Sequence, residues 1–118
     1  MMSIFASYAE IPTVVSTSPN RYMFVSWGKN EHLLKVDTRI GKVWDVVPKK
    51  DATKSNLKLF QNLPTIDEAN SFDGRFVFET TFTGGGDTVY YMMDSKTGQV
   101  WQLNMYRCEA TEIFESTN

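Results

Sequence analysis

Hydrophobic and polar residues alternate along several short stretches of this chain. A two-residue period places successive side chains on opposite faces of a strand, so it is typical of β-structure. Gly, Pro, Asn and Asp residues lie between the alternating stretches and indicate turns. We therefore expect an all-β protein. The predicted strands are residues 13–17, 21–27, 32–36, 42–47, 75–82, 88–93, 99–104 and 111–115.

The chain contains the same motif twice. Residues 33–47, LLKVDTRIGKVWDVV, and residues 90–104, YYMMDSKTGQVWQLN, share the pattern Asp-Thr/Ser-x-x-Gly-Lys/Gln-Val-Trp. The separation of equivalent positions grows from 52 residues, Ile11 to Leu63, to 58 residues, Asp51 to Glu109, so the copies differ by loop insertions. The repeat predicts one domain, residues 1–118, made of two tandem, pseudo-symmetric antiparallel meanders at about 11–62 and 63–118. Together the meanders would have about six to eight strands.

The motif has a local structural explanation. Asp37 and Asp94 each open a turn, where a carboxylate can accept backbone N–H groups two or three residues further on. Gly41 and Gly98 stand at the far end of the same turns and supply a positive φ. Two carboxylates can also serve as an acid–base pair, but their position at the turns favours a structural role.

The connection between the repeats is harder to interpret. Residues 57–59, Leu-Lys-Leu, alternate like a strand, whereas residues 54–62 also suit one or two helical turns. Further along, Thr65-Ile66-Asp67-Glu68 has the spacing of a capping box. This predicts one short helix near Ile66, ended by Asp73-Gly74.

Alternation also assigns side chains to faces of the predicted sheets. We expect a core centred on Phe24 and Trp44 of the first repeat and Phe78 and Trp101 of the second. The other core positions would be Tyr22, Leu34, Val36, Val46, Phe76, Tyr91, Met93 and Leu103. The opposite face is apolar as well, with Met23, Val25, Trp27, Leu33, Val43, Val77, Tyr90, Met92 and Val100. Because an exposed sheet face is usually polar, linkers or another subunit should cover it, which predicts a homo-oligomer.

Composition indicates one folded domain: of the 118 residues, 14% are aromatic and 22% are charged. The net charge of −2 conceals an asymmetry. Up to residue 59 there are nine Lys/Arg against five Asp/Glu (+4), and from residue 60 three against nine (−6). This pattern reflects either drift of solvated residues or charge complementarity, between the repeats or head to tail between subunits. The net negative charge of the chain argues against a nucleic-acid partner.

No apolar run approaches the roughly 20 residues of a membrane-spanning helix, so no membrane partner is expected. The first residues, MMSIFASYAEIP, lack a basic region before their short apolar stretch. This argues against an uncleaved signal peptide and makes a cytoplasmic location the expectation.

Residues that carry chemistry are sparse. His32 is the only histidine and Cys108 the only cysteine, which is too few for a closed zinc site. Residues 84–87, Gly-Gly-Gly-Asp, lack the Gly-Lys-Ser/Thr of a phosphate-binding loop and fit a long hairpin loop. We expect no catalytic residue, metal or cofactor, and a packed Cys108 thiol.

Binding is better supported by the composition. Three Trp, five Tyr and eight Phe supply rings suited to recognition. Trp27 lies on the second face without a matching Trp in the other repeat. Arg39, Lys42, Lys96 and Gln99 flank the two turns, as a cationic set suited to anionic ligands or simply as solvated turn residues.

The Asp-x-x-x-Gly-x-Val-Trp motif resembles a D-T-x-T-G-x-V-W unit of small bacterial and phage proteins of unknown function. It is also similar to the Asp-x-x-Thr-Gly-x-x-x-Trp unit of quinoprotein-type β-propeller blades. The second repeat fits with Thr97-Gly98, whereas the first has Ile40 in place of Thr. A closed propeller has about four to eight blades. Two units could reach that number only by oligomerisation, for instance as three two-blade chains. The resemblance implies no quinone, metal or catalytic residue.

Together these features favour a non-enzymatic, homo-oligomeric β module that binds or assembles. Its ligand would be a small anionic molecule or a protein partner. Two alternatives remain open: a carbohydrate-binding module that uses Trp27, Trp44 and Trp101, and a small hydrolase that uses His32.

Overall fold

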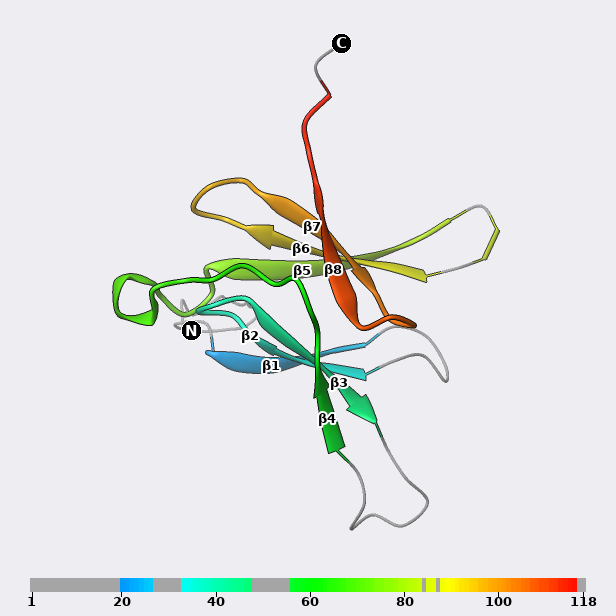
Figure 1. Ribbon diagram of the computed structural model, residues 1–118, viewed down its shortest axis with the longest axis horizontal. Helices are drawn as coiled ribbons and strands as arrows, with labels where there is room; N and C mark the ends of the chain where they lie inside the picture. Colours follow the sequence, from blue (N-terminus) through cyan, green and yellow to red (C-terminus); the bar gives the residue numbers. More distant parts are fainter. Residues whose placement is uncertain (1–19, 27–32, 48–55, 84, 87, 117–118) are drawn as a thin grey trace, which may run out of the picture.

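The computed structural model describes residues 20–26, 33–47, 56–83, 85–86 and 88–116. These residues form two four-stranded antiparallel sheets, in which each strand pairs with the next one along the chain (Figure 1). The first sheet contains β1 (Tyr22–Ser26), β2 (Leu33–Asp37), β3 (Lys42–Val47) and β4 (Asn56–Leu59). The second contains β5 (Phe76–Phe82), β6 (Thr88–Asp94), β7 (Val100–Asn104) and β8 (Glu109–Ile113). The predicted all-β fold of two meanders is confirmed.

Residues 57–59 belong to β4, the last strand of the first sheet, so the strand interpretation of these residues is correct. The short helix is a single 3-10 turn, η3 (Glu68–Asn70). Its N-cap is Asp67 rather than Thr65, because the Asp67 carboxylate accepts the Ala69 N–H at 3.2 Å. The predicted strand at 13–17 lies outside the described residues.

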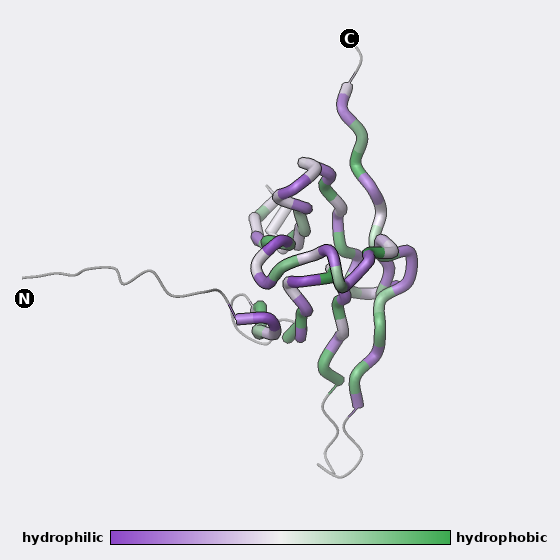
Figure 2. The backbone as a smooth tube through the Cα atoms, turned by 90° about the vertical axis from the view of Figure 1, so that its left-hand side faces the viewer, coloured by the Kyte–Doolittle hydropathy of each residue, from purple (hydrophilic) through white to green (hydrophobic). Residues whose placement is uncertain are grey.

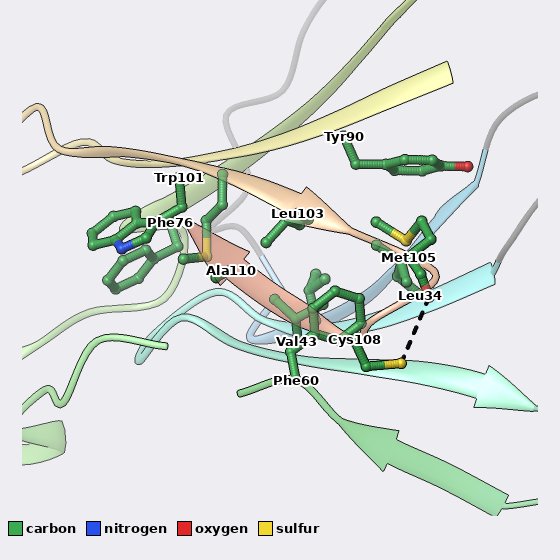
Figure 3. Close-up of a cluster of buried hydrophobic side chains, with 12 residues drawn as sticks. Leu34, Val43, Phe60, Phe76, Tyr90, Trp101, Leu103, Met105, Cys108 and Ala110 are labelled. Atoms are coloured by element: carbon green, nitrogen blue, oxygen red, sulfur yellow. Dashed lines mark hydrogen bonds between the residues drawn. The ribbon is translucent and has the colours of Figure 1, made fainter. Parts of the chain in front are cut away.

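The two sheets pack face to face, with the hydrophobic core between them (Figure 3). Hydrophobic and hydrophilic positions are interspersed along the strands (Figure 2). Each sheet buries one face, and removing this apolar surface from water stabilises the stack. The core residues are Leu34, Val36, Val43 and Phe60 from the first repeat and Phe76, Tyr90, Met92, Trp101, Leu103, Met105, Cys108 and Ala110 from the second.

The second repeat buries the face that carries Phe76 and Trp101, whose ring centroids are 6.2 Å apart. Phe78 packs against the edge of the same core. Between these strands lies Met92, which pairs with Phe78 on one side and Trp101 on the other. The neighbouring residues Tyr91 and Met93 therefore point outward, and their assignment to the core is wrong. Tyr90 and Met92 take their place.

The first repeat buries the opposite face. Strand register places Phe24 beside Lys35 and Lys35 beside Trp44, so these three side chains share one face. Phe24 is 67% exposed, which corrects its assignment to the core. Trp44 is only half-buried. Val43, which was expected on the second face, is instead part of the core.

Each repeat also contains an arginine–aspartate pair that joins β1 or β5 to the turn of the motif. Arg75 donates from Nε and Nη2 to the two carboxylate oxygens of Asp94, at 2.9 and 2.8 Å. Arg21 makes the equivalent contacts with Asp37, at 3.1 Å from Nε and 3.0 Å from Nη2. Such two-point pairing fixes the direction of both side chains. The arginine therefore holds the start of its sheet against the turn.

The aspartates also make the turn contacts that the motif predicts. Asp94 Oδ1 accepts the Lys96 N–H at 2.9 Å, and Asp37 Oδ1 accepts the Arg39 N–H at 3.0 Å. Gly41 and Gly98 close the turns with φ values of +76° and +82°. Asp37 and Asp94 are thus structural turn residues.

We expect Asp94→Asn to destabilise the protein by about 3 kcal/mol, because it leaves the buried Arg75 guanidinium without its counter-charge. The matched variant Asp37→Asn should cost less, since the Arg21 side chain is partly exposed and can be solvated. Urea unfolding followed by circular dichroism measures both. Equal losses would contradict this ranking of the two pairs.

Stability should also depend on pH through Asp94. The Arg75 hydrogen bonds lower the pKa of Asp94 from 3.8 to about 2. Because the folded-state pKa lies below the unfolded one, the carboxylate contributes stability above about pH 4, and this contribution is lost as pH falls toward 2. We expect wild type to lose about 2 kcal/mol more than Asp94→Asn between pH 5 and pH 2. Parallel stability curves for the two proteins would contradict the assignment.

Candidate functional site

The outer face of the first sheet carries, besides Leu33 on β2, six apolar side chains that are exposed or only half-buried. They come from three strands, and the antiparallel register brings them together: Phe24, Trp44 and Leu59 lie in one row, and Val46 and Leu57 in the next. An apolar, aromatic sheet face of this kind is typical of an interaction surface. The members of this face are Tyr22, Phe24, Trp44, Val46, Leu57 and Leu59.

Lys35 lies at the centre of this face. Its Nζ is 5.1 Å from the centroid of the Tyr22 ring and 4.9 Å from that of the Trp44 ring. These distances are those of cation–π contacts, so the ammonium group holds the two rings beside it. Lys42 lies two residues before Trp44 on β3 and therefore on the same face, where it adds an exposed cation. The surface is therefore aromatic and positively charged.

The outer face of the second sheet is also apolar, but its charges are negative. Val77, Met93, Val100 and Ile113 form one continuous row across the four strands. Glu79, on β5, lies in the adjacent row, and Glu109 begins β8 on the same face, where it forms a long ion pair with Arg107 at 3.8 Å. The two outer faces thus match in apolar character and differ in charge.

The residues expected to bind an anionic ligand do not form one cationic site. Arg39 is engaged by the second repeat: its Nε donates to Asp73 at 2.8 Å and its Nη1 to the Ser71 carbonyl at 3.2 Å. Gln99 donates to Glu112 at 3.0 Å. Lys42 and Lys96 have exposed side chains. Trp27 and His32 lie outside the described residues.

An open hollow lies where β1 meets β5. Its volume is about 330 Å³. Its lining mixes apolar and polar side chains, with one carboxylate and no basic side chain, so its chemistry does not favour an anionic ligand. The hollow is lined by Met23, Phe24, Val25, Ser26, Phe78, Glu79 and Thr80.

The Cys108 thiol is buried between the sheets, as expected for a packed cysteine. Its Sγ lies 3.7 Å from the Met105 carbonyl oxygen and 3.9 Å from Asp45 Oδ2. Burial raises the pKa of the thiol, and the nearby Asp45 carboxylate raises it further. Within the described part of the chain, no three His, Cys, Asp or Glu side chains are grouped to hold a metal ion.

Sequence reasoning missed two features of these surfaces. Arg21 and Arg75 were not identified as partners of the motif aspartates; the available signal was the recurrence of an arginine directly before β1 and directly before β5. Lys35 was not singled out, because Phe24 was placed on the face of Leu34 and Val36, whereas it shares its face with Lys35. Pairing Phe24 with Trp44 across β2 would have placed Lys35 between them.

Comparisons with protein-family models, with curated proteins and with solved structures find no match to this chain. None of the helical residues that the structure describes belongs to a helix long and apolar enough to cross a membrane.

We expect Cys108 to react slowly with iodoacetamide in the native protein, because a buried, protonated thiol is a poor nucleophile. Unfolding in urea should accelerate the reaction by at least about tenfold, since the thiol then has its ordinary pKa. Mass spectrometry of timed samples measures the alkylated fraction. Equal rates with and without urea would contradict the burial of the thiol.

Proposed function

We propose that this chain is a non-enzymatic assembly module, and that its copies associate through the outer face of the first sheet. The observation that carries this proposal is the exposure of Phe24 and its neighbours. An antiparallel sheet with one face exposed to solvent is expected to carry polar side chains on that face. Here the side facing solvent is instead aromatic and aliphatic, and contact with protein would remove it from water.

The composition of the face supports a protein partner. Aromatic side chains are enriched at protein–protein interfaces, where they bury a large area at a low cost in side-chain entropy. The charges at Lys35 and Lys42 lie within and beside the apolar patch and would orient a partner of opposite charge. The acidic outer face of the second sheet offers such charges in every copy of the chain.

The other ligand classes have less support. Arg39 is neutralised by Asp73, which removes it from a binding site for small anions. Trp101 is buried in the core, so it does not present its ring to a carbohydrate. A protein surface is therefore the ligand that we favour.

We expect wild-type protein to elute as an assembly larger than the 13.5 kDa chain in light scattering on a sizing column, and Phe24→Ser to shift it toward the monomer. The substitution removes an exposed ring from the proposed contact and leaves the core intact. Tyr106→Ser is the matched control, because Tyr106 is also exposed but lies in the turn between β7 and β8.

The assembly should also weaken with salt if the opposed charges contribute to it. A monomeric wild-type protein at all concentrations would overturn the proposed function. So would an oligomer that Phe24→Ser leaves unchanged.

A further inference from the structure

We propose that the copies associate head to tail, with the outer face of the first sheet of one copy packed on the outer face of the second sheet of the next. We further propose that a small number of copies close into a ring. This inference rests on the proposed function, since it requires association through the outer face of the first sheet. It adds the identity of the opposing surface and the geometry of the assembly.

The first step of the argument is the way the two repeats stack within one chain. The motif makes Val36 equivalent to Met93 and Trp44 equivalent to Trp101. Inside the chain, the Val36 face of the first sheet packs against the Trp101 face of the second. The faces left outside are therefore the Trp44 face and the Met93 face. They are the counterparts of the two faces already joined, so the same contact can be repeated between chains.

Equivalent residues of the two repeats differ in exposure as this arrangement requires: one is buried inside the chain and the other lies on an outer face. Val36 is 0% exposed and its counterpart Met93 is 38% exposed. Register extends the comparison beyond the motif, because Trp44 pairs with Leu59 and Trp101 pairs with Glu112. The residues that follow are Phe60, 2% exposed, and Ile113, 43% exposed. Met93 and Ile113, the two exposed members of these pairs, are both apolar, as expected if a second copy covers them.

The turns show a second set of matched contacts. Gly41 lies so close beneath Phe76 that an added Cβ would be 2.9 Å from the ring, and the Phe76 N–H donates to the Thr38 carbonyl at 2.8 Å. The equivalents in the outer faces are Gly98 and Tyr22. An added Cβ on Gly98 would meet nothing within 4 Å, and the Tyr22 ring is exposed. Tyr22 of one copy can thus occupy the space above Gly98 of another.

The strand edges supply a third set. After β4, the Gln61 N–H donates to the Cys108 carbonyl at 2.8 Å, and the Ala110 N–H donates to the Gln61 carbonyl at 2.9 Å. These bonds attach the chain after the first sheet to the edge of the second. By register, the residue equivalent to Gln61 is Phe114, which follows β8 and is exposed. Phe114 would pair in the same way with the edge of β4 in the next copy.

Charge favours the same orientation. The outer face of the first sheet carries Lys35 and Lys42, and the outer face of the second carries Glu79 and Glu109. Head-to-tail contact brings these opposite charges together. A symmetric contact between two first sheets would instead place the lysines of both copies in one interface. Like charges opposed in this way disfavour the symmetric dimer.

Head-to-tail contacts either continue as a filament or close as a ring. Rings of stacked four-stranded sheets contain about four to eight sheets. Each chain supplies two, so closure corresponds to about two to four copies. A ring results when the repeated rotation between successive sheets returns to the starting copy, and a filament results when it does not.

The test uses two single-face variants, Phe24→Asp on the first sheet and Met93→Lys on the second. Each variant alone should be monomeric, because every head-to-tail contact in it has one damaged face. Mixed in equal amounts at several hundred micromolar, they should form a complex of two chains, since one intact face remains on each. Circular dichroism checks that both variants are folded.

The outcomes separate the two proposals. Loss of assembly in Phe24→Asp with wild-type behaviour of Met93→Lys would overturn the head-to-tail geometry and leave the proposed function standing. A monomeric wild type would overturn both. Failure of the mixed variants to associate would also overturn the head-to-tail geometry.

Native mass spectrometry of the wild type tests closure. One discrete mass of two to four chains that does not grow with concentration is expected for a ring, and continuous growth would overturn closure. Tyr22→Ala tests the turn contact, because it removes the ring proposed to occupy the space above Gly98 of the neighbouring copy. It should weaken assembly at least tenfold, and an unchanged association constant would overturn this register of the contact.

Discussion

The structure depends on one constraint: two copies of the same sheet, stacked in the same orientation, bury opposite faces. The Trp101 face of the second repeat meets the Val36 face of the first. The first repeat must then leave its Trp44 face outside, although the motif is the same. Every feature of the outer surfaces follows from this arrangement, including the aromatic patch on one side and the Met93 row on the other.

The all-β class, the two meanders and most strand boundaries could be predicted, because strand periodicity and turn residues are local signals. Which face lies inside could not, since both faces are apolar in both repeats and the stacking direction is a property of the pair. Counting alternation from Phe24 also assumed that each repeat buries its own aromatic residues. Only the second does so, which is why Trp101 is buried and Trp44 is only half-buried although the two hold the same place in the motif.

The structural role of the turn residues could be predicted because their contacts are local in the sequence. Asp37 and Asp94 act through backbone N–H groups two residues away, a distance that sequence spacing specifies. Their arginine partners are 16 and 19 residues away, so the pairing depends on how β1 and β5 lie beside the turns. Lys35 illustrates the same limit, because its position between two rings is set by register across three strands.

The segment that joins the two sheets has a consequence for how stacking responds to protein concentration. Residues 60–75 hold the second sheet within reach of the first, so their contact is unimolecular and the effective concentration of one sheet near the other is on the order of millimolar for a short tether. Phe60 and Gln61 shorten that tether further by packing on the second sheet. The same contact between two separate chains has no such tether, so the extent to which it forms depends on the protein concentration. The covalent link therefore makes one stacking step permanent and any further step dilution-sensitive.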